Sequence, residues 1–126
     1  MSRIVLAILV ISSGLASQYG GGVAERVIAV RQTNRVSERL PDTLPETDGY
    51  LAVLKCEHIG EVWYLRYEGR VYSFLVIDCA GDQATIDWMV RNHIIGEIDH
   101  EMAVEWGVVG VGAKVERVLL SRYLPE

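Results

Sequence analysis

The stretch YLAVLKCEHIGEVWYLRYEGRVYSFLVI at residues 50–77 sets the expectation for the fold. Three runs within it are rich in Val, Tyr, Trp and Leu: residues 50–56, 61–67 and 70–77. Such residues favour strands, and Glu68-Gly69 is typical of the tight turn of a β-hairpin. Polar and apolar residues alternate imperfectly, which indicates strands that are partly buried on both faces, as in a closed barrel. We therefore expect three consecutive strands.

Before this stretch, the pattern is less regular. Residues 23–30 (VAERVIAV) are compatible with either a strand or a short helix. Residues 31–48 are polar and contain Pro41 and Pro45, which predicts a long surface loop.

After it, Asp82 is suited to cap a helix that continues to about His93. Residues 94–98 predict a short strand, and Asp99 is a plausible N-cap for a helix over residues 100–106 that ends at Gly107. Residues 108–120 predict a strand, a glycine-rich bend and another strand. Many short strands with two small helices indicate a small β-barrel.

The 126 residues are sufficient for one domain, and half of them are apolar, so a packed core is expected. The formal net charge is −5, and the charges are interspersed. An acidic chain without a stripe of Lys and Arg is unsuited to a phosphate backbone, so we expect no nucleic-acid partner.

The N-terminus predicts export. Arg3 precedes an unbroken apolar run over residues 4–11, and small residues stand at the −3 and −1 positions of a cut after Ala16. We therefore expect a signal peptide over residues 1–16, a domain over residues 17–126, and no stable membrane span after processing. The alternatives are a buried N-terminal strand, an earlier cut, or a segment retained as a tether. The expected location is secreted, periplasmic or associated with the cell wall.

The chain has two cysteines, Cys56 and Cys79. In an oxidising compartment such a pair predicts one disulfide, and the alternative is two buried free thiols.

Two aspartates are candidates for acid–base chemistry. Asp78 stands at the end of an apolar strand, where partial burial of a carboxyl raises its pKa and suits a general acid. Asp99 is the second candidate, because glycoside chemistry uses two carboxylates that meet across a groove. The structural alternatives are a turn or cap residue for Asp78 and a helix N-cap for Asp99.

Aromatic side chains that are suited to stack on sugar rings are spread over the chain: Tyr19, Trp63, Tyr64, Trp88 and Trp106. Packing in the core is their more frequent role. The sequence Asp99-His100-Glu101 contains residue types that bind metals, but adjacent residues on a helix do not face one site. We therefore assign neither a metal nor a cofactor.

Four short motifs follow one another along the chain. They are Ala16-Ser17-Gln18-Tyr19-Gly20, then Leu44-Pro45 with Gly49 and Tyr50-Leu51-Ala52-Val53, then Val76-Ile77-Asp78, and finally Ile98-Asp99 with Ala103 and Trp106-Gly107. In this order they resemble motifs of the rare lipoprotein A-like double-psi β-barrels over nearly all of residues 17–126. The resemblance implies a mainly β fold, a small six-stranded double-psi barrel with one or two short helices, related to expansins and barwin-like proteins.

The resemblance also implies action on polysaccharide. It gives Asp78 the position of the family's proposed catalytic acid, Asp99 that of a second aspartate beside the groove, and Tyr19 a place in the same groove. The extra helix expected around Trp88 would lie near that groove. Asp78 is followed by Cys79-Ala80 instead of Arg-Gly-Pro, and the family's Thr-Ala-x-Gly-Glu stretch and the His before Leu-Pro are not recognisable.

Three functional hypotheses follow. The first is an exported lytic transglycosylase-like enzyme acting on peptidoglycan, in which Asp78 protonates the glycosidic oxygen without a cofactor. The second is a non-catalytic, expansin-like module that binds a cell-wall glycan. The third is a secreted scaffold domain.

Overall fold

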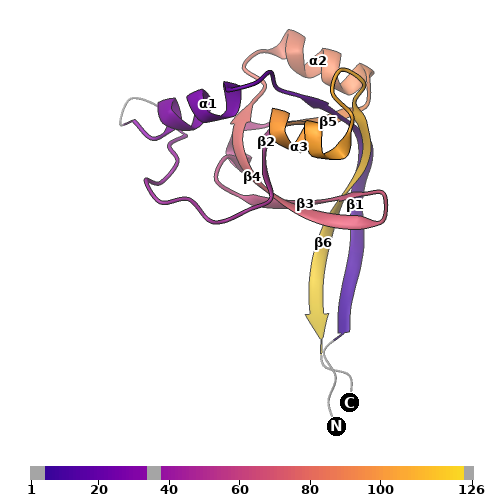
Figure 1. Ribbon diagram of the computed structural model, residues 1–126. Helices are drawn as coiled ribbons and strands as arrows, with labels where there is room; N and C mark the ends of the chain where they lie inside the picture. The colour runs from indigo at the N-terminus through magenta and orange to yellow at the C-terminus, as the bar shows by residue number, and fades with distance from the viewer. Residues whose placement is uncertain (1–4, 34–37, 124–126) are drawn as a thin grey trace.

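The computed structural model describes residues 5–33 and 38–123, which form a mainly β fold (Figure 1). In chain order its elements are β1 (Val5–Gln18), α1 (Val23–Arg31), β2 (Gly49–Val53), the short 3-10 helix η1 (Cys56–His58), β3 (Val62–Tyr67), β4 (Arg70–Cys79), α2 (Gln83–Arg91), β5 (Ile94–Ile98), α3 (His100–Trp106) and β6 (Ala113–Tyr123).

The strands hydrogen-bond in the order β1-β5-β2-β4-β3-β6, and β6 pairs again with β1, so that the sheet closes as a barrel. The β3–β4 hairpin turns at Glu68 and Gly69, whose φ angles of 48° and 79° are both left-handed. A tight hairpin turn of type I′ requires such angles at both positions, so the predicted hairpin is confirmed.

The strand pairing repeats between the two halves of the chain. Strand β1 pairs in parallel with β5 and antiparallel with β6, just as β4 pairs in parallel with β2 and antiparallel with β3. Helices α1 and α2 follow β1 and β4, and η1 and α3 follow β2 and β5. The halves β1–β3 and β4–β6 therefore have the same connectivity and interlock in one sheet, although the sequence shows no internal repeat.

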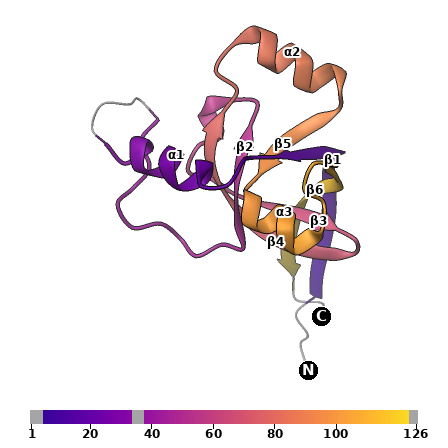
Figure 2. The same cartoon turned by 45° about the horizontal axis from the view of Figure 1, so that its top comes forward.

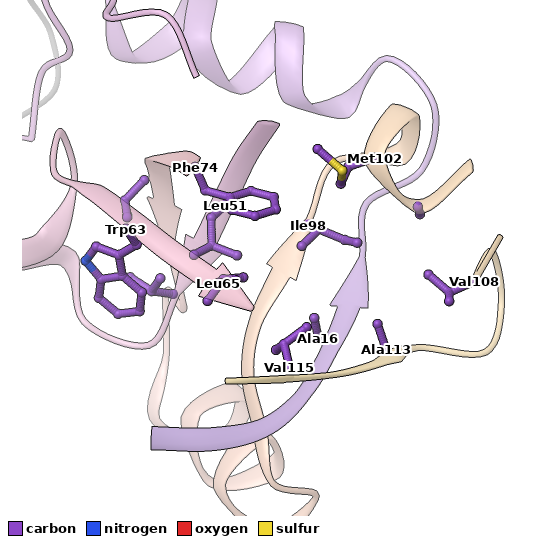
Figure 3. Close-up of a cluster of buried hydrophobic side chains, with 13 residues drawn as sticks. Ala16, Leu51, Trp63, Leu65, Phe74, Ile98, Met102, Val108, Ala113 and Val115 are labelled. Atoms are coloured by element: carbon purple, nitrogen blue, oxygen red, sulfur yellow. The ribbon is translucent and has the colours of Figure 1, made fainter. Parts of the chain in front are cut away.

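The barrel interior is filled by apolar side chains from all six strands, and α3 adds Met102 and Ala103 to the same cluster. Figure 3 shows Leu51 of β2, Phe74 of β4 and Ile98 of β5 within this cluster; each is at most 1% exposed. Neighbouring residues in a strand point to opposite faces. The residues that flank these core positions on the described strands are therefore presented outward.

Helix α1 covers part of the outer surface of β4. Ala24 of α1, Leu40 of the following loop, and Leu75 and Ile77 of β4 form a second buried cluster. This packing explains why both faces of β4 are apolar, as the imperfect alternation in the sequence indicated. Helix α2 lies apart from α1 beside β5 (Figure 2).

Caps define the other two helices. The Asp82 side chain accepts a hydrogen bond from Thr85 N at the start of α2, and the Asp99 side chain accepts one from Met102 N at the start of α3. Helix α3 ends at Gly107, whose φ of 71° favours glycine. The two predicted helices and their caps are confirmed.

Residues 23–31 form a helix, one of the two possibilities that the sequence left open. Other element predictions need revision. Strand β4 continues through Asp78 to Cys79, beyond the expected end at Ile77. The strand expected at the start of residues 108–120 is absent from the described structure, in which residues 108–112 form turns before β6. Gly110 and Gly112 there have left-handed φ angles, which a regular strand excludes.

The predicted signal segment lies in strand β1. Residues 5–16 supply every described pair between β1 and β6, from Val5↔Tyr123 to Ala16↔Ala113. The first part of this ribbon runs away from the barrel (Figure 1), and Ile8, Leu9, Val10 and Ile11 are 42–62% exposed. Ala16, in contrast, is 1% exposed. The expected boundary between residues 16 and 17 therefore falls inside a barrel strand, and a chain cut there lacks the β1–β6 seam.

Candidate functional site

Two carboxylates lie on one row of residues that crosses four strands. Ala52 of β2 pairs with Asp78 of β4 on one side and with Glu97 of β5 on the other, and Glu97 pairs with Ser17 of β1. We call Asp78, Ala52, Glu97 and Ser17 the outer row. Neighbouring strands are roughly 4.8 Å apart, so the Cα atoms of Asp78 and Glu97 are separated by roughly 10 Å across the small Ala52 side chain.

The outer row faces away from the barrel core. Ala16, Leu51, Val53 and Ile98, which flank Ser17, Ala52 and Glu97 in sequence, all point into the core. The register between β2 and β4 shifts just before Asp78, and its carboxylate bonds Arg31 of α1, the helix on the outer surface of β4. Asp78 and Glu97 are partly buried, so solvent can reach the row at these two residues. Ala52 is 8% exposed, and the Ser17 hydroxyl oxygen is buried.

Asp78 is engaged in an ion pair with Arg31, the last residue of α1. Arg31 Nη2 donates a hydrogen bond of 2.7 Å to Asp78 Oδ1, and Arg31 Nη1 lies 3.6 Å from Glu38 Oε2. The Arg31 side chain is 16% exposed and that of Asp78 is 28% exposed. The expected catalytic aspartate is therefore at the surface of a groove, but a guanidinium already holds its carboxylate.

Tyr19 lies close to this pair, just after the end of β1. Its backbone N–H donates to Ile98 O at 2.9 Å, which fixes the residue beside β5. Its hydroxyl is buried close to Asp78 without a hydrogen bond of good geometry among the described residues. Burial raises the pKa of this hydroxyl, and the negative charges of Asp78 and Glu97 raise it further, against the opposing effect of Arg31. Tyr19 is therefore held neutral as a potential donor.

Glu97 is the half-buried member of the outer row. Burial raises the pKa of its carboxyl, the nearby Ser17 hydroxyl partly offsets this effect, and the charge of Asp78 raises the pKa again. A carboxyl in such surroundings retains its proton at a higher pH than a free glutamate.

The Asp99 side chain is buried and holds two elements of the fold together. The residue is 7% exposed, and its Oδ1 accepts from Tyr50 N at 2.9 Å while its Oδ2 accepts from Met102 N at 3.3 Å. Gly49 is required beside it, because a Cβ atom at that position would lie 2.6 Å from Asp99 Oδ1. Asp99 therefore caps α3 and joins β2 to it, and this position gives no support to the expected pairing of Asp99 with Asp78 in a groove.

Trp88 of α2 stands beside the other end of the outer row. It is 46% exposed and lines an open hollow of about 400 Å³ together with Ser17, Gln18, Ile94 and Val111. A second open hollow of about 410 Å³ lies beside Asp78 and Arg31, against Val23, Val27 and Val30 of α1. Ser17, at one end of the outer row, lines the first hollow, and Asp78, at the other end, lines the second.

The other aromatic candidates lie elsewhere. Trp106 stacks on Tyr67 with ring centroids 4.2 Å apart, and Trp63 is 8% exposed beneath the Arg117 guanidinium, 3.5 Å from its ring centroid. These contacts fix both tryptophans against the core and the wall of the barrel.

The predicted disulfide is present. Cys56 of η1 is bonded to Cys79 at the end of β4, with Cα atoms 4.9 Å apart. Because Cys79 directly follows Asp78, the bond anchors the end of the strand that carries this carboxylate.

In the described part of the chain, His, Cys, Asp and Glu side chains do not gather in groups of three or more that could hold a metal ion. Among the same residues, no α-helix has the length and apolar character needed to cross a membrane.

Sequence reasoning missed Glu97 and Arg31. The alternation Ile94, Gly96, Ile98 in the predicted strand presents Glu97 outward, which was a detectable signal. Its register with Ala52 and Asp78 was not detectable, because strand order follows from the fold as a whole.

Comparison of the chain with protein-family models, with curated proteins and with solved structures finds no match.

Proposed function

We propose that this chain is an exported domain that acts on a cell-wall polysaccharide, such as peptidoglycan, and that the outer row is its glycan-binding groove. The observation that carries the proposal is the pair of carboxylates, Asp78 and Glu97, on one accessible row between two open hollows. Sugars are bound by planar polar side chains and aromatic faces, and the row offers both, with Trp88 at one end. Two carboxylates are also the groups that glycosidic cleavage needs.

The connectivity supports placing the fold among double-psi β-barrels of the rare lipoprotein A-like type. Two halves of the same connectivity that interlock through parallel pairs are expected of such a barrel, and the short motifs at residues 16–20, 76–78 and 98–107 lie at the ends of β1, β4 and β5. The disulfide is compatible with a location outside the cytoplasm. These features support the proposed substrate class only through the resemblance, since a fold by itself does not define an activity.

The favoured activity is a lytic transglycosylase-like cleavage of the glycan. The second candidate is a non-catalytic, expansin-like binder, and the Asp78–Arg31 ion pair favours it, because a carboxylate held by a guanidinium is better suited to hold a sugar hydroxyl than to donate a proton.

Both candidates, the cleaving enzyme and the non-catalytic binder, are tested by incubating purified glycan strands with the folded protein. Soluble glycan products from wild type, reduced in Asp78→Asn but not in the exposed-surface control Asp42→Asn, would support the enzyme. Sedimentation of the protein with the strands without products, weakened by Asp78→Asn or Trp88→Ala, would support the binder. If the protein neither releases products nor binds the strands, the proposal is contradicted and the scaffold role remains.

A further inference from the structure

We infer that Glu97, and not Asp78, is the proton donor of the outer row, an inference that rests on the proposed glycan-cleaving function. Glu97 is an inner member of the row, between Ala52 of β2 and Ser17 of β1. In strand register Glu97 lies between Asp78, which lines the hollow beside α1, and Ser17, which lines the hollow beside Trp88. Neither the resemblance nor the sequence patterns had assigned a role to this residue.

Asp78 and Glu97 have different surroundings, which suit the two carboxylates to different roles. Asp78 accepts a hydrogen bond from Arg31 at 2.7 Å, so one of its carboxylate oxygens is already engaged by a guanidinium. Among the described residues, Glu97 forms no ion pair with a Lys, Arg or His side chain. The geometry therefore suits Asp78 to orient a sugar and leaves Glu97 as the carboxyl of the row that no cation holds.

The electrostatic environment agrees with this division. The titratable and charged groups near Glu97 are Asp78 of β4 and Tyr19 after β1, and Arg31 of α1 is paired with Asp78. Burial, followed by the effect of Asp78, raises the pKa of Glu97. A general acid works best when its pKa is near the working pH, and an upward shift moves a glutamic acid toward that condition.

The proposed step balances without water or a cofactor. The Glu97 carboxyl gives its proton to the glycosidic oxygen as the bond from that oxygen to the anomeric carbon breaks, and the electron pair of the bond stays on the oxygen. A hydroxyl of the same sugar forms a new bond to the anomeric carbon through its own electron pair. Its proton passes to the Glu97 carboxylate, which restores the acid for the next cycle.

The test compares Glu97→Gln and Glu97→Asp with wild type and with Glu101→Gln, which replaces an exposed glutamate of α3. Initial rates of product release are measured on purified glycan strands, and binding is measured by sedimentation with the same strands. We expect Glu97→Gln to lower the rate by about 10²-fold or more with little change in binding, because general acid catalysis contributes about 10²- to 10⁴-fold. Glu97→Asp should restore part of the rate, and Glu101→Gln should match wild type.

The pH dependence of the cleavage rate is a second measurement, and it can be made on the wild-type protein itself. The wild-type rate should fall as pH rises through the raised pKa of Glu97, and this limb should be missing from the residual rate of Glu97→Gln. A full rate in Glu97→Gln would overturn the inference while the proposed glycan cleavage stands. Wild-type protein that binds strands without forming products would instead overturn the cleavage itself, and the role of Glu97 with it.

Discussion

Arg31 Nη2 donates a 2.7 Å hydrogen bond to Asp78 Oδ1, which ties the last residue of helix α1 to the end of strand β4. Arg31→Met removes this bond and leaves the partly buried Asp78 carboxylate without its cation. We expect the free energy of unfolding to fall by about 1 to 2 kcal/mol, between the values for exposed and buried ion pairs. Urea denaturation measures the change, and Arg26→Met, an exposed arginine on the same helix, is the control. Equal stabilities for the two variants would show that the pair contributes nothing.

Asp99 and Asp82 have the same local role in different surroundings, so they form a natural comparison. Asp99→Ala deletes the cap of α3 and also leaves Tyr50 N without its acceptor in a buried position. We expect it to lower the free energy of unfolding by about 2 to 4 kcal/mol, the sum of a lost cap and an unsatisfied buried donor. Asp82→Ala removes only the exposed cap of α2, so its loss should be clearly smaller.

The same Asp99 variant separates structure from chemistry. If Asp99 only caps and joins elements, the rate of glycan cleavage per folded molecule should remain that of wild type at a temperature where the variant is folded. A rate lowered by more than the unfolded fraction explains would return Asp99 to the catalytic site.

The positions of these aspartates show which parts of the molecule could be predicted from sequence. Caps depend on residues three apart, so Asp82 and Asp99 were predictable as helix starts. The β3–β4 hairpin depends on the adjacent Glu68 and Gly69, and it was predictable for the same reason. The outer row was not, because Asp78 and Glu97 are brought together through Ala52, whose pairs lie far away in sequence. Composition does not separate a signal segment from strand β1, because an apolar run has the same composition in both roles.

The Cys56–Cys79 disulfide joins residues that are 23 positions apart. By the entropy of closing a loop of this length, it should contribute about 3 kcal/mol to the free energy of unfolding. Urea midpoints with and without a thiol reductant measure this contribution. The double variant Cys56→Ala/Cys79→Ala should be less stable and insensitive to reductant. A wild-type midpoint that does not move after complete reduction, verified by thiol alkylation and mass, would contradict the expectation.

Ionisation of Glu97 should lower the free energy of unfolding as the pH rises. Its pKa is raised above the ordinary 4.5 in the folded protein, so the folded state binds this proton more tightly than the unfolded state. The free energy of unfolding therefore decreases as pH rises from about 4.5 through the folded pKa, and it is constant above that value. Glu97→Gln lacks this decrease, so its stability relative to wild type should increase over the same interval. Glu101→Gln is the control, and parallel pH profiles for Glu97→Gln and wild type would contradict the raised pKa.

Strand β1 allows a direct test of where processing can occur. Residues 5–9 pair with β6 beyond the part of that strand that pairs with β3, whereas Val10 pairs with the buried Val118 and residues 12–16 pair with residues 113–117. A protein that begins at Ser12 loses the exposed ribbon and the single pair Val10↔Val118, so it should keep one cooperative urea transition, followed by the fluorescence of Trp63 in the core and Trp106 packed against it. A protein that begins at Ser17 lacks the whole β1–β6 seam and leaves an edge of β6 unpaired, so we expect a broad, non-cooperative transition. An equally sharp transition for both proteins would show that the barrel tolerates a cut after Ala16. A difference between them would place any cut that preserves this fold before Ser12, and N-terminal sequencing of the exported protein would then identify the bond.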